Sequence, residues 1–210
     1  MFLDRYDAGK QLSVKLRTYL HTKAIILAMP RGALQIGEIL HKELKLPLDV
    51  IVTKKIPHPN NQELAIGAVG GKNELYIDLE TSSGIFTSYI KEQIAKLNKL
   101  IEERYLLYRG EKTPPNIKNK TVILVDDGIA TGSTIIAAIN LLKKQKPKKI
   151  IIATPICGFK AYERIVNSVD EIIVLEKPEE FMAIGQFYRN FPQVEDEEAI
   201  SILKRCRKAI

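Results

Sequence analysis

The sequence has 210 residues, of which 45% are hydrophobic and 27% are charged, as in an ordinary globular protein. No stretch approaches the roughly 18 consecutive apolar residues of a membrane span, and the charged opening MFLDRYDAGK does not resemble a signal peptide. A cytoplasmic protein without membrane association is expected. The cysteines and histidines are scattered, which argues against a zinc site. The net charge of +7 fits nucleic acid, an acidic partner or a phosphate ester.

Helical and extended patterns alternate along the chain, which predicts an α/β fold with a central, mostly parallel sheet flanked by helices. The expected helices cover residues 4–20, 32–44, 87–109, 132–145, 159–168 and 195–207. The expected strands cover residues 24–29, 48–56, 74–78, 121–126, 149–154 and 171–175. One domain over 1–210 is expected, with 176–210 as a small hood segment and C-terminal helix.

Two segments between these elements have a distinctive composition. Residues 57–73 are rich in proline, asparagine and glycine, which predicts a long loop, and loops of that length are usually functional or mobile. The basic run KKQKPKK, Lys143 to Lys149, stands between a helical pattern and an apolar strand. This setting favours a solvated turn, and a nucleic-acid contact is the weaker alternative.

The segment VILVDDGIATGST, Val122 to Thr134, joins an apolar strand to a helix through two aspartates and a loop of small residues. Side chains alternate across a strand, so Asp126 and Asp127 converge only if the chain turns, which Gly128 makes easy. Two such carboxylates repel each other unless a cation or hydroxyl donors offset their charge, and a Mg²⁺-bound sugar diol supplies both. The following helix start offers free N–H groups to a phosphate.

The same segment closely resembles the loop that binds phosphoribosyl pyrophosphate (PRPP) in type I phosphoribosyltransferases. The resemblance implies that the two aspartates hold the ribose hydroxyls, directly or through Mg²⁺, and that residues 130–134 bind the 5′-phosphate. The PRPP-binding residues expected on this basis are Asp126, Asp127, Gly128, Ala130, Thr131, Gly132, Ser133, Thr134 and Gly32. Asp126 and Asp127 are also the expected metal ligands.

Two further segments stand where this family contacts pyrophosphate. AMPRGA, residues 28–33, follows the first apolar strand, and Arg31 can pair with a diphosphate in the fork geometry of a guanidinium. Family members often have a strained or cis peptide here, so one is expected at one of the two peptide bonds that flank Arg31. Lys54 and Lys55 follow at the end of the next expected strand. They should point to opposite faces, so only one is expected to reach the site. The 57–73 loop would then close over it as a lid.

The resemblance spans nearly the whole chain and includes the opening FLDRYDAGKQL and the C-terminal FMAIGQFYRNFPQVEDEE. It implies transfer of the phosphoribosyl group from PRPP to a nucleophile, usually a ring nitrogen, with release of pyrophosphate. In the 6-oxopurine enzymes an aspartate stands at the position of Ala130, so hypoxanthine and guanine are disfavoured. Adenine-type enzymes carry alanine there. The acceptor is therefore expected to be an unidentified small molecule resembling a nucleobase.

Aromatic residues cluster after the last expected strand, at Phe181, Phe187, Tyr188 and Phe191. Tyr188, with Phe187, is the candidate for stacking on the acceptor. The alternative is that these rings pack the C-terminal helix against the sheet.

A second class of function remains open. The same fold could serve a regulator that senses PRPP or a nucleotide and binds nucleic acid through its basic surface. Arg31 and the two lysines favour the enzyme, because a sensor needs no leaving-group machinery. The sequence does not determine the oligomeric state, and a homodimer is an open alternative by analogy with relatives that dimerise.

Overall fold

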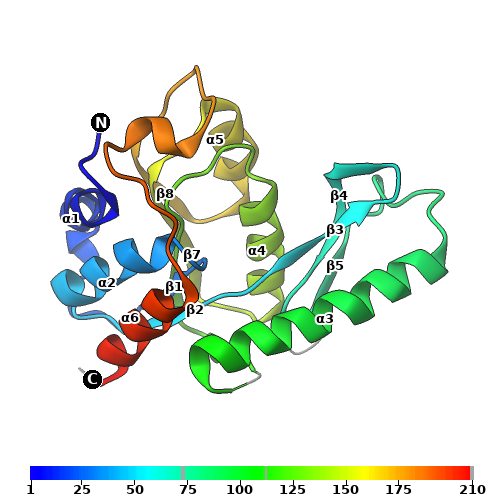
Figure 1. Cartoon of the computed structure of the whole chain (residues 1–210), viewed down its shortest axis with the longest axis horizontal. Coiled ribbons are helices and arrows are strands. Elements are labelled where there is room, and N and C mark those ends of the chain that lie inside the picture. The colour runs from blue at the N-terminus through cyan, green and yellow to red at the C-terminus, as the bar shows by residue number, and fades with distance from the viewer. Residues whose placement is uncertain (72–73, 112, 209–210) are drawn as a thin grey trace.

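A five-stranded sheet forms the main body of the protein in the computed structural model, which describes residues 1–71, 74–111 and 113–208 (Figure 1). All its strand pairs are parallel, and their order is β2-β1-β6-β7-β8. The strands are β1 (Ile25–Ala28), β2 (Leu48–Val50), β6 (Thr121–Val125), β7 (Lys149–Ile156) and β8 (Glu171–Glu176). The predicted α/β fold with a central parallel sheet is confirmed.

Helices cover both faces of this sheet (Figure 1). One face carries α1 (Arg5–Lys15), α2 (Ala33–Leu44) and α6 (Asp196–Lys208), and the other carries α4 (Ser133–Lys144) and α5 (Phe159–Ile165). In β1, Ile26 and Ala28 join the first core, whereas Ile25 and Leu27 join the second. A strand buried on both faces must be apolar throughout, which explains the uninterrupted hydrophobic runs in the sequence.

The strand order places the loops that follow β1 and β6 side by side. The chain passes from β1 to β2 in one direction along the sheet, and from β6 through β7 to β8 in the other. The direction therefore reverses between the adjacent strands β1 and β6. In open α/β sheets, ligands bind at the carboxyl ends of the strands at such a point.

An arm projects from the main sheet (Figure 1). The sequence analysis predicted its last strand, at 74–78, but missed the strand over 61–69 and joined the first to the preceding strand. Residues 48–56 are not one strand, because β2 ends at Val50 and a second, antiparallel sheet follows. This sheet contains β3 (Lys54–His58), β4 (Asn61–Val69) and β5 (Leu75–Ile77), and α3 (Thr87–Arg109) packs along it. The predicted 57–73 loop is therefore largely a hairpin, except for residues 72–73, which lie outside the described residues.

The composition that indicated a loop has a different physical basis in the hairpin. Pro57 lies in the edge strand β3, where the register shifts on both sides of it, and an edge strand tolerates a missing N–H. Gly67 lies inside β4 because a Cβ there would come within 2.4 Å of the Tyr76 carbonyl oxygen. Proline and glycine therefore occur here in an irregular pair of strands and not in a loop.

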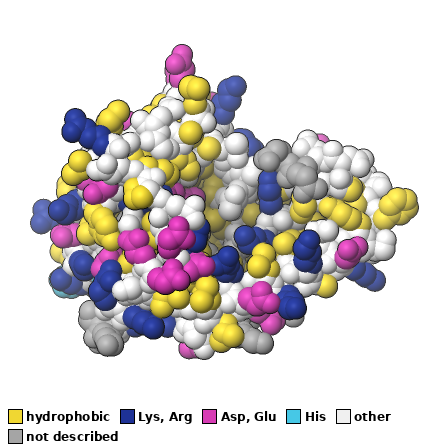
Figure 2. All heavy atoms as spheres, in the orientation of Figure 1, with side chains coloured by type: hydrophobic (Ala, Val, Ile, Leu, Met, Phe, Trp, Pro, Cys, Tyr) yellow, Lys and Arg dark blue, Asp and Glu magenta, His cyan; other side chains and the backbone are white. Residues whose placement is uncertain are grey.

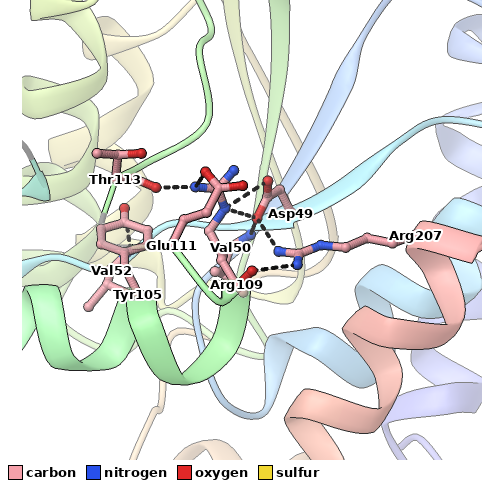
Figure 3. Close-up of polar contacts among 8 residues, drawn as sticks. All are labelled: Asp49, Val50, Val52, Tyr105, Arg109, Glu111, Thr113 and Arg207. Atoms are coloured by element: carbon pink, nitrogen blue, oxygen red, sulfur yellow. Dashed lines mark hydrogen bonds and ion pairs between the residues drawn. The ribbon is translucent and has the colours of Figure 1, made fainter.

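Polar contacts tie α3 to the main body at the base of the arm (Figure 3). Arg109 Nε donates to Asp49 Oδ1 at 2.9 Å, and Arg207 of α6 donates to the Arg109 carbonyl at 2.8 Å. The buried Tyr105 hydroxyl accepts a hydrogen bond from the Val52 N–H at 3.0 Å. These contacts set the position of α3 relative to the segment that joins β2 to β3.

The other expected elements are found with small shifts at their ends. The first helix ends at Lys15 and a 3₁₀ helix follows at Arg17–Tyr19, with others at Val166–Ser168 and Ile184–Phe187. The basic run 143–149 spans the end of α4, a turn and the first residue of β7, as the solvated-turn interpretation predicts. Among residues 1–71, 74–111 and 113–208, no helix has the length and apolar character needed to cross a membrane.

Replacing Tyr105 with phenylalanine tests the anchor of α3. The variant leaves the buried Val52 N–H without its partner, so we expect the free energy of unfolding to fall by ~1–3 kcal/mol. Urea denaturation measures the change. Tyr162→Phe, at a partly buried ring beneath the Lys177 ammonium, is the control, with an expected change within ~0.5 kcal/mol. Equal denaturation midpoints for wild type and Tyr105→Phe would contradict the anchoring role.

Candidate functional site

Two loops meet at the carboxyl edge of the sheet where the strand direction reverses. Residues 29–32 follow β1 and residues 126–132 follow β6. The Met29 N–H donates to the Val125 carbonyl at 3.0 Å and joins their starting points. The Pro30–Arg31 peptide bond is cis, at one of the two positions where the sequence analysis expected it. The predicted PRPP and pyrophosphate loops are therefore neighbours.

Asp126 comes directly after β6 and is partly buried. Its Oδ1 accepts a hydrogen bond from the Asp127 N–H at 3.0 Å. Burial, and secondly the nearby Asp127 carboxylate, raise the pKa of Asp126 well above its usual range. A cation or hydroxyl donors beside this carboxylate would favour its ionised form. Among the described residues, Asp126 thus has the Asp127 N–H as a hydrogen-bond donor but no cation paired with its charge.

Asp127 has a different environment, because a buried arginine compensates its charge. Arg5 Nε donates to Asp127 Oδ2 at 2.7 Å, and the two side chains are 5% and 14% exposed. Arg5 also donates to the Pro192 carbonyl at 2.8 Å and lies 3.7 Å above the centre of the Phe191 ring. Metal binding by Asp127 stays a prediction, and this ion pair argues against it.

Sequence reasoning missed Arg5. It belongs to the opening segment that carried the family resemblance, but it lies 122 positions from Asp127 in the chain. No local pattern connects the two residues. The available signal was its place in the expected helix over 4–20, within the opening FLDRYDAGKQL.

Gly32 and Gly128 make room for neighbouring side chains. A Cβ on Gly32 would lie 2.0 Å from Asp127 Oδ2 and 2.9 Å from Arg5 Nε. A Cβ on Gly128 would lie 2.6 Å from Cγ2 of Ile184, in the segment that precedes α6. The glycines therefore allow the loops and the C-terminal segment to close around Asp127.

The loop before α4 has the form of an anion site. Gly132 has a φ of 80°, a left-handed conformation that favours glycine, and α4 begins at the next residue. Arg164 supports the loop by donating to the Thr131 carbonyl at 2.7 Å. Ala130, Thr131 and Thr134 are exposed, and Ser133 is partly buried. The N–H groups of the first helical turn have no partners within the helix, so they can bind a phosphate.

A cavity of about 310 Å³ lies beside this loop. Its walls come from the loop after β1, the connection between β2 and β3, helix α3 and the start of α4. The lining residues are Met29, Pro30, Arg31, Ile51, Val52, Thr53, Lys54, Arg104, Tyr108 and Thr134. Lys54 lines the cavity and Lys55 does not, so the structure favours Lys54 as the lysine that faces the site. The Thr53 Oγ is buried and has no hydrogen-bond partner among the described residues.

Tyr188 is buried, with 5% of its surface exposed. Its ring stacks on Phe191 at 4.8 Å between centroids and contacts Phe2 at 5.5 Å. Its hydroxyl donates to the Asp127 carbonyl at 2.7 Å, and burial raises the pKa of Tyr188 far above its usual value. Phe187 is partly buried against Phe181.

These contacts match the packing alternative for the aromatic cluster. The buried Tyr188 ring contacts both Phe2 and Phe191, and its hydroxyl donates to the backbone carbonyl of Asp127. The acceptor-stacking role of Tyr188 and Phe187 stays a prediction, and the packing of Tyr188 argues against it.

The sheet and its two loops place the chain among the open α/β proteins, in which ligands bind at the carboxyl ends of the strands at the switch point. Comparison with known proteins narrows this class. The profile of the phosphoribosyl transferase domain matches residues 4–190. The chain belongs to this family.

Individual relatives agree with the family assignment. A protein of Mycobacterium tuberculosis provisionally named a phosphoribosyl transferase is 33% identical, over 99% of this chain and 47% of its own length. The chain thus spans about half the length of that curated relative. The crystal structure of TT1426 from Thermus thermophilus is 31% identical and has a TM-score of 0.87, covering 97% of this chain and 98% of its own. A uracil phosphoribosyltransferase of Ureaplasma parvum is 36% identical over 32% of this chain and 39% of its own length.

Gly32→Ala tests the packing around Asp127. The added Cβ must displace the Asp127 carboxylate or Arg5, so we expect the free energy of unfolding to fall by ~1–3 kcal/mol. Chemical denaturation measures this change. The control is Gly185→Ala, whose Cβ would have its nearest contact at 3.3 Å, on the Phe191 ring. Unchanged stability of Gly32→Ala would show that Asp127 is not confined as described.

Proposed function

We propose that this protein is a Mg²⁺-dependent phosphoribosyltransferase that transfers the 5-phosphoribosyl group of PRPP to a ring nitrogen of a small heterocycle and releases pyrophosphate. The observation that carries the proposal is the order of groups along the carboxyl edge of the sheet. The start of α4 and the Asp126 carboxylate belong to the loop after β6, and the basic cavity is lined by Arg31 from the neighbouring loop after β1 and by Lys54 from the start of β3.

This order matches the chemistry of PRPP, which carries a 5′-phosphate and a 1-diphosphate on opposite sides of a ribose diol. The loop from Ala130 to Thr134 would bind the 5′-phosphate, and Asp126 would accept hydrogen bonds from the diol. Arg31 and Lys54 would bind the diphosphate and stabilise the negative charge that develops on it as the glycosidic bond breaks. A site for a single phosphate would not need two anion subsites.

The residues present fit Mg²⁺. Proteins usually bind this ion through one or two carboxylates together with substrate phosphates and water. Asp126 offers such a carboxylate. Burial, and secondly the Asp127 charge, raise its pKa, and a divalent cation would favour the ionised form. Among the described residues no group of three or more acidic, histidine or cysteine side chains could hold a metal, so most ligands would come from PRPP and water. When bound, Mg²⁺ would supply positive charge to the leaving diphosphate.

The acceptor is proposed only as a class, a planar heterocycle resembling a nucleobase. Ala130 is exposed on the loop and carries no group able to exchange protons with a purine ring. This supports an acceptor other than hypoxanthine or guanine. No observation on the described residues favours the regulator alternative.

Turnover of PRPP with Mg²⁺ across a panel of heterocycles tests the proposal. We expect acceptor-dependent release of pyrophosphate and a loss of about 100-fold or more in Asp126→Asn, because the variant removes the ionised diol and metal ligand. A variant that also changed Asp127 would break the ion pair with Arg5, so a loss of activity could then come from a loss of structure. Asp126→Asn should unfold at or above the wild-type temperature. Failure of the wild-type protein to bind PRPP in calorimetry would sink the proposal.

The two lysines provide a second test. Lys54→Gln should weaken binding of Mg²⁺-pyrophosphate by about ten-fold, because a charge-assisted contact to the anion is lost. Lys55→Gln removes the same charge from the adjacent position and should cost several-fold less. Calorimetric titration measures both. A larger effect of Lys55→Gln would reverse the assignment of the lysine that faces the cavity.

A further inference from the structure

The basic cavity contains an arginine from outside the two loops. Arg104 lies on α3, in the arm, and lines the cavity together with Arg31 and Lys54. Its side chain is 38% exposed, so a ligand in the cavity can reach it. Its neighbour Tyr105 binds the Val52 N–H, two positions before Lys54, which positions Arg104 against that segment.

The Asp196 carboxylate contacts several donor groups beside the cavity. Arg104 Nη1 donates to Asp196 Oδ2 at 2.8 Å, and the Tyr108 hydroxyl donates to Asp196 Oδ1 at 2.6 Å. Arg31 Nη1 lies 3.6 Å from the same Oδ1 and 3.3 Å from Glu195 Oε2. The guanidinium group expected to hold the diphosphate is therefore paired with acids at the start of α6.

The charges in this region are segregated. The cavity lining includes Arg31, Lys54 and Arg104 but no acidic residue. The carboxylates that compensate this charge, Glu195 and Asp196, are not among the lining residues. Figure 2 shows acidic side chains gathered near the start of α6, beside Lys and Arg side chains at the hollow between the main body and the arm. Asp196 is 28% exposed, so it can turn toward solvent without burying an unpaired charge.

The protonation states suit an exchange of anions. The hydrogen bond from Tyr108, and to a smaller extent the one from Arg104, lower the pKa of Asp196, so this carboxylate is ionised at neutral pH. Burial and the Asp196 hydrogen bond raise the pKa of Tyr108 to about 12, so its hydroxyl remains a donor. The cluster thus offers two guanidinium groups and one hydroxyl to any anion that replaces Asp196.

We propose that Arg104 binds the diphosphate of PRPP together with Arg31, and that the Asp196 carboxylate occupies their guanidinium groups until the diphosphate displaces it. This inference rests on the proposed function, because it takes the cavity as the diphosphate subsite. A diphosphate carries several negative charges and presents oxygens that match guanidinium forks, so it outcompetes a single carboxylate. Asp196 then acts as a competing anion within the chain, and it lowers the affinity for pyrophosphate product as well as for PRPP.

The alternative is a purely structural contact in which Asp196 ties α6 to α3. A structural tie predicts that Asp196→Asn lowers stability and leaves the affinity for pyrophosphate unchanged or weaker. Competition predicts that the same variant binds pyrophosphate more tightly. The two accounts therefore differ in the sign of the change in affinity.

Calorimetric titration with Mg²⁺-pyrophosphate, and separately with PRPP, distinguishes them in the full chain. We expect Arg104→Gln to weaken both affinities by about ten-fold or more, because a charge-assisted contact is lost. Arg104→Lys, which keeps the charge without the fork, should lie between Arg104→Gln and wild type. Asp196→Asn should tighten pyrophosphate binding by about three-fold or more, because a neutral amide competes less well for two guanidinium groups.

Arg207→Gln is the charge-matched control. Arg207 lies on α6, like Asp196, but contacts Asp49 and the Arg109 carbonyl outside the cavity. The affinity of the Arg207→Gln variant for pyrophosphate should differ from that of the wild type by less than about two-fold. Each variant is titrated below its own unfolding temperature, so that a loss of stability is not read as a loss of binding.

The outcomes separate this inference from the proposed function. A wild-type protein that binds neither PRPP nor pyrophosphate would remove the proposed function. Wild-type binding that Arg104→Gln and Arg104→Lys leave unchanged would overturn the role of Arg104 alone. Unchanged or weaker pyrophosphate binding in Asp196→Asn would overturn the competition.

Discussion

The buried ion pair between Arg5 and Asp127 joins the parts of the chain on which the site depends. It connects α1 to the loop after β6, and through Pro192 and Phe191 it connects both to the segment before α6. A buried charge without its partner is strongly destabilising, so each of these segments can occupy its place only when the others do. Gly32 belongs to the same arrangement, because any side chain there would occupy the space of the Asp127 carboxylate.

This constraint separates the roles of the two adjacent aspartates. Asp127 has its charge compensated by the protein, and the Tyr188 hydroxyl holds its carbonyl. Asp126 has no comparable partner among the residues that the structure describes, and burial beside Asp127 disfavours its charge. A ligand that brings a cation or hydroxyl donors therefore gains most at Asp126. The acidic pair combines one residue that holds the loop with one that is available for binding.

The arm contributes to the site as well as to the fold. Its base is tied to the end of β2 by Tyr105 and Arg109. Lys54 at the start of β3 and Arg104 on α3 thereby reach the same cavity as Arg31. Three cations in one cavity repel each other, and the carboxylates of Glu195 and Asp196 reduce this repulsion. The start of α6 thereby couples the charge of the cavity to the packing of the C-terminal helix.

Sequence patterns were sufficient wherever the relevant interactions are local. The two-sided burial of β1 and β6 requires apolar runs, and the turn into α4 requires Gly132, so the strand–loop–helix unit from Val122 to Thr134 could be recognised directly. The cis peptide at Arg31 was expected from family resemblance. Helix α3 was also predicted with its observed bounds, because its apolar residues recur at helical spacing.

Tertiary structure decided what depends on residues far apart in the chain. The hairpin of the arm looked like a loop because Pro57 and Gly67 are unusual in strands, and only the pairing with β4 and the approach of Tyr76 explain them. Arg5 meets Asp127, Asp196 meets Arg104, and the Tyr188 ring is enclosed, through contacts between segments that no local periodicity relates. Local patterns determine which polar and charged groups each segment carries. The packing of distant segments decides which of those groups are paired within the protein and which remain available to a ligand.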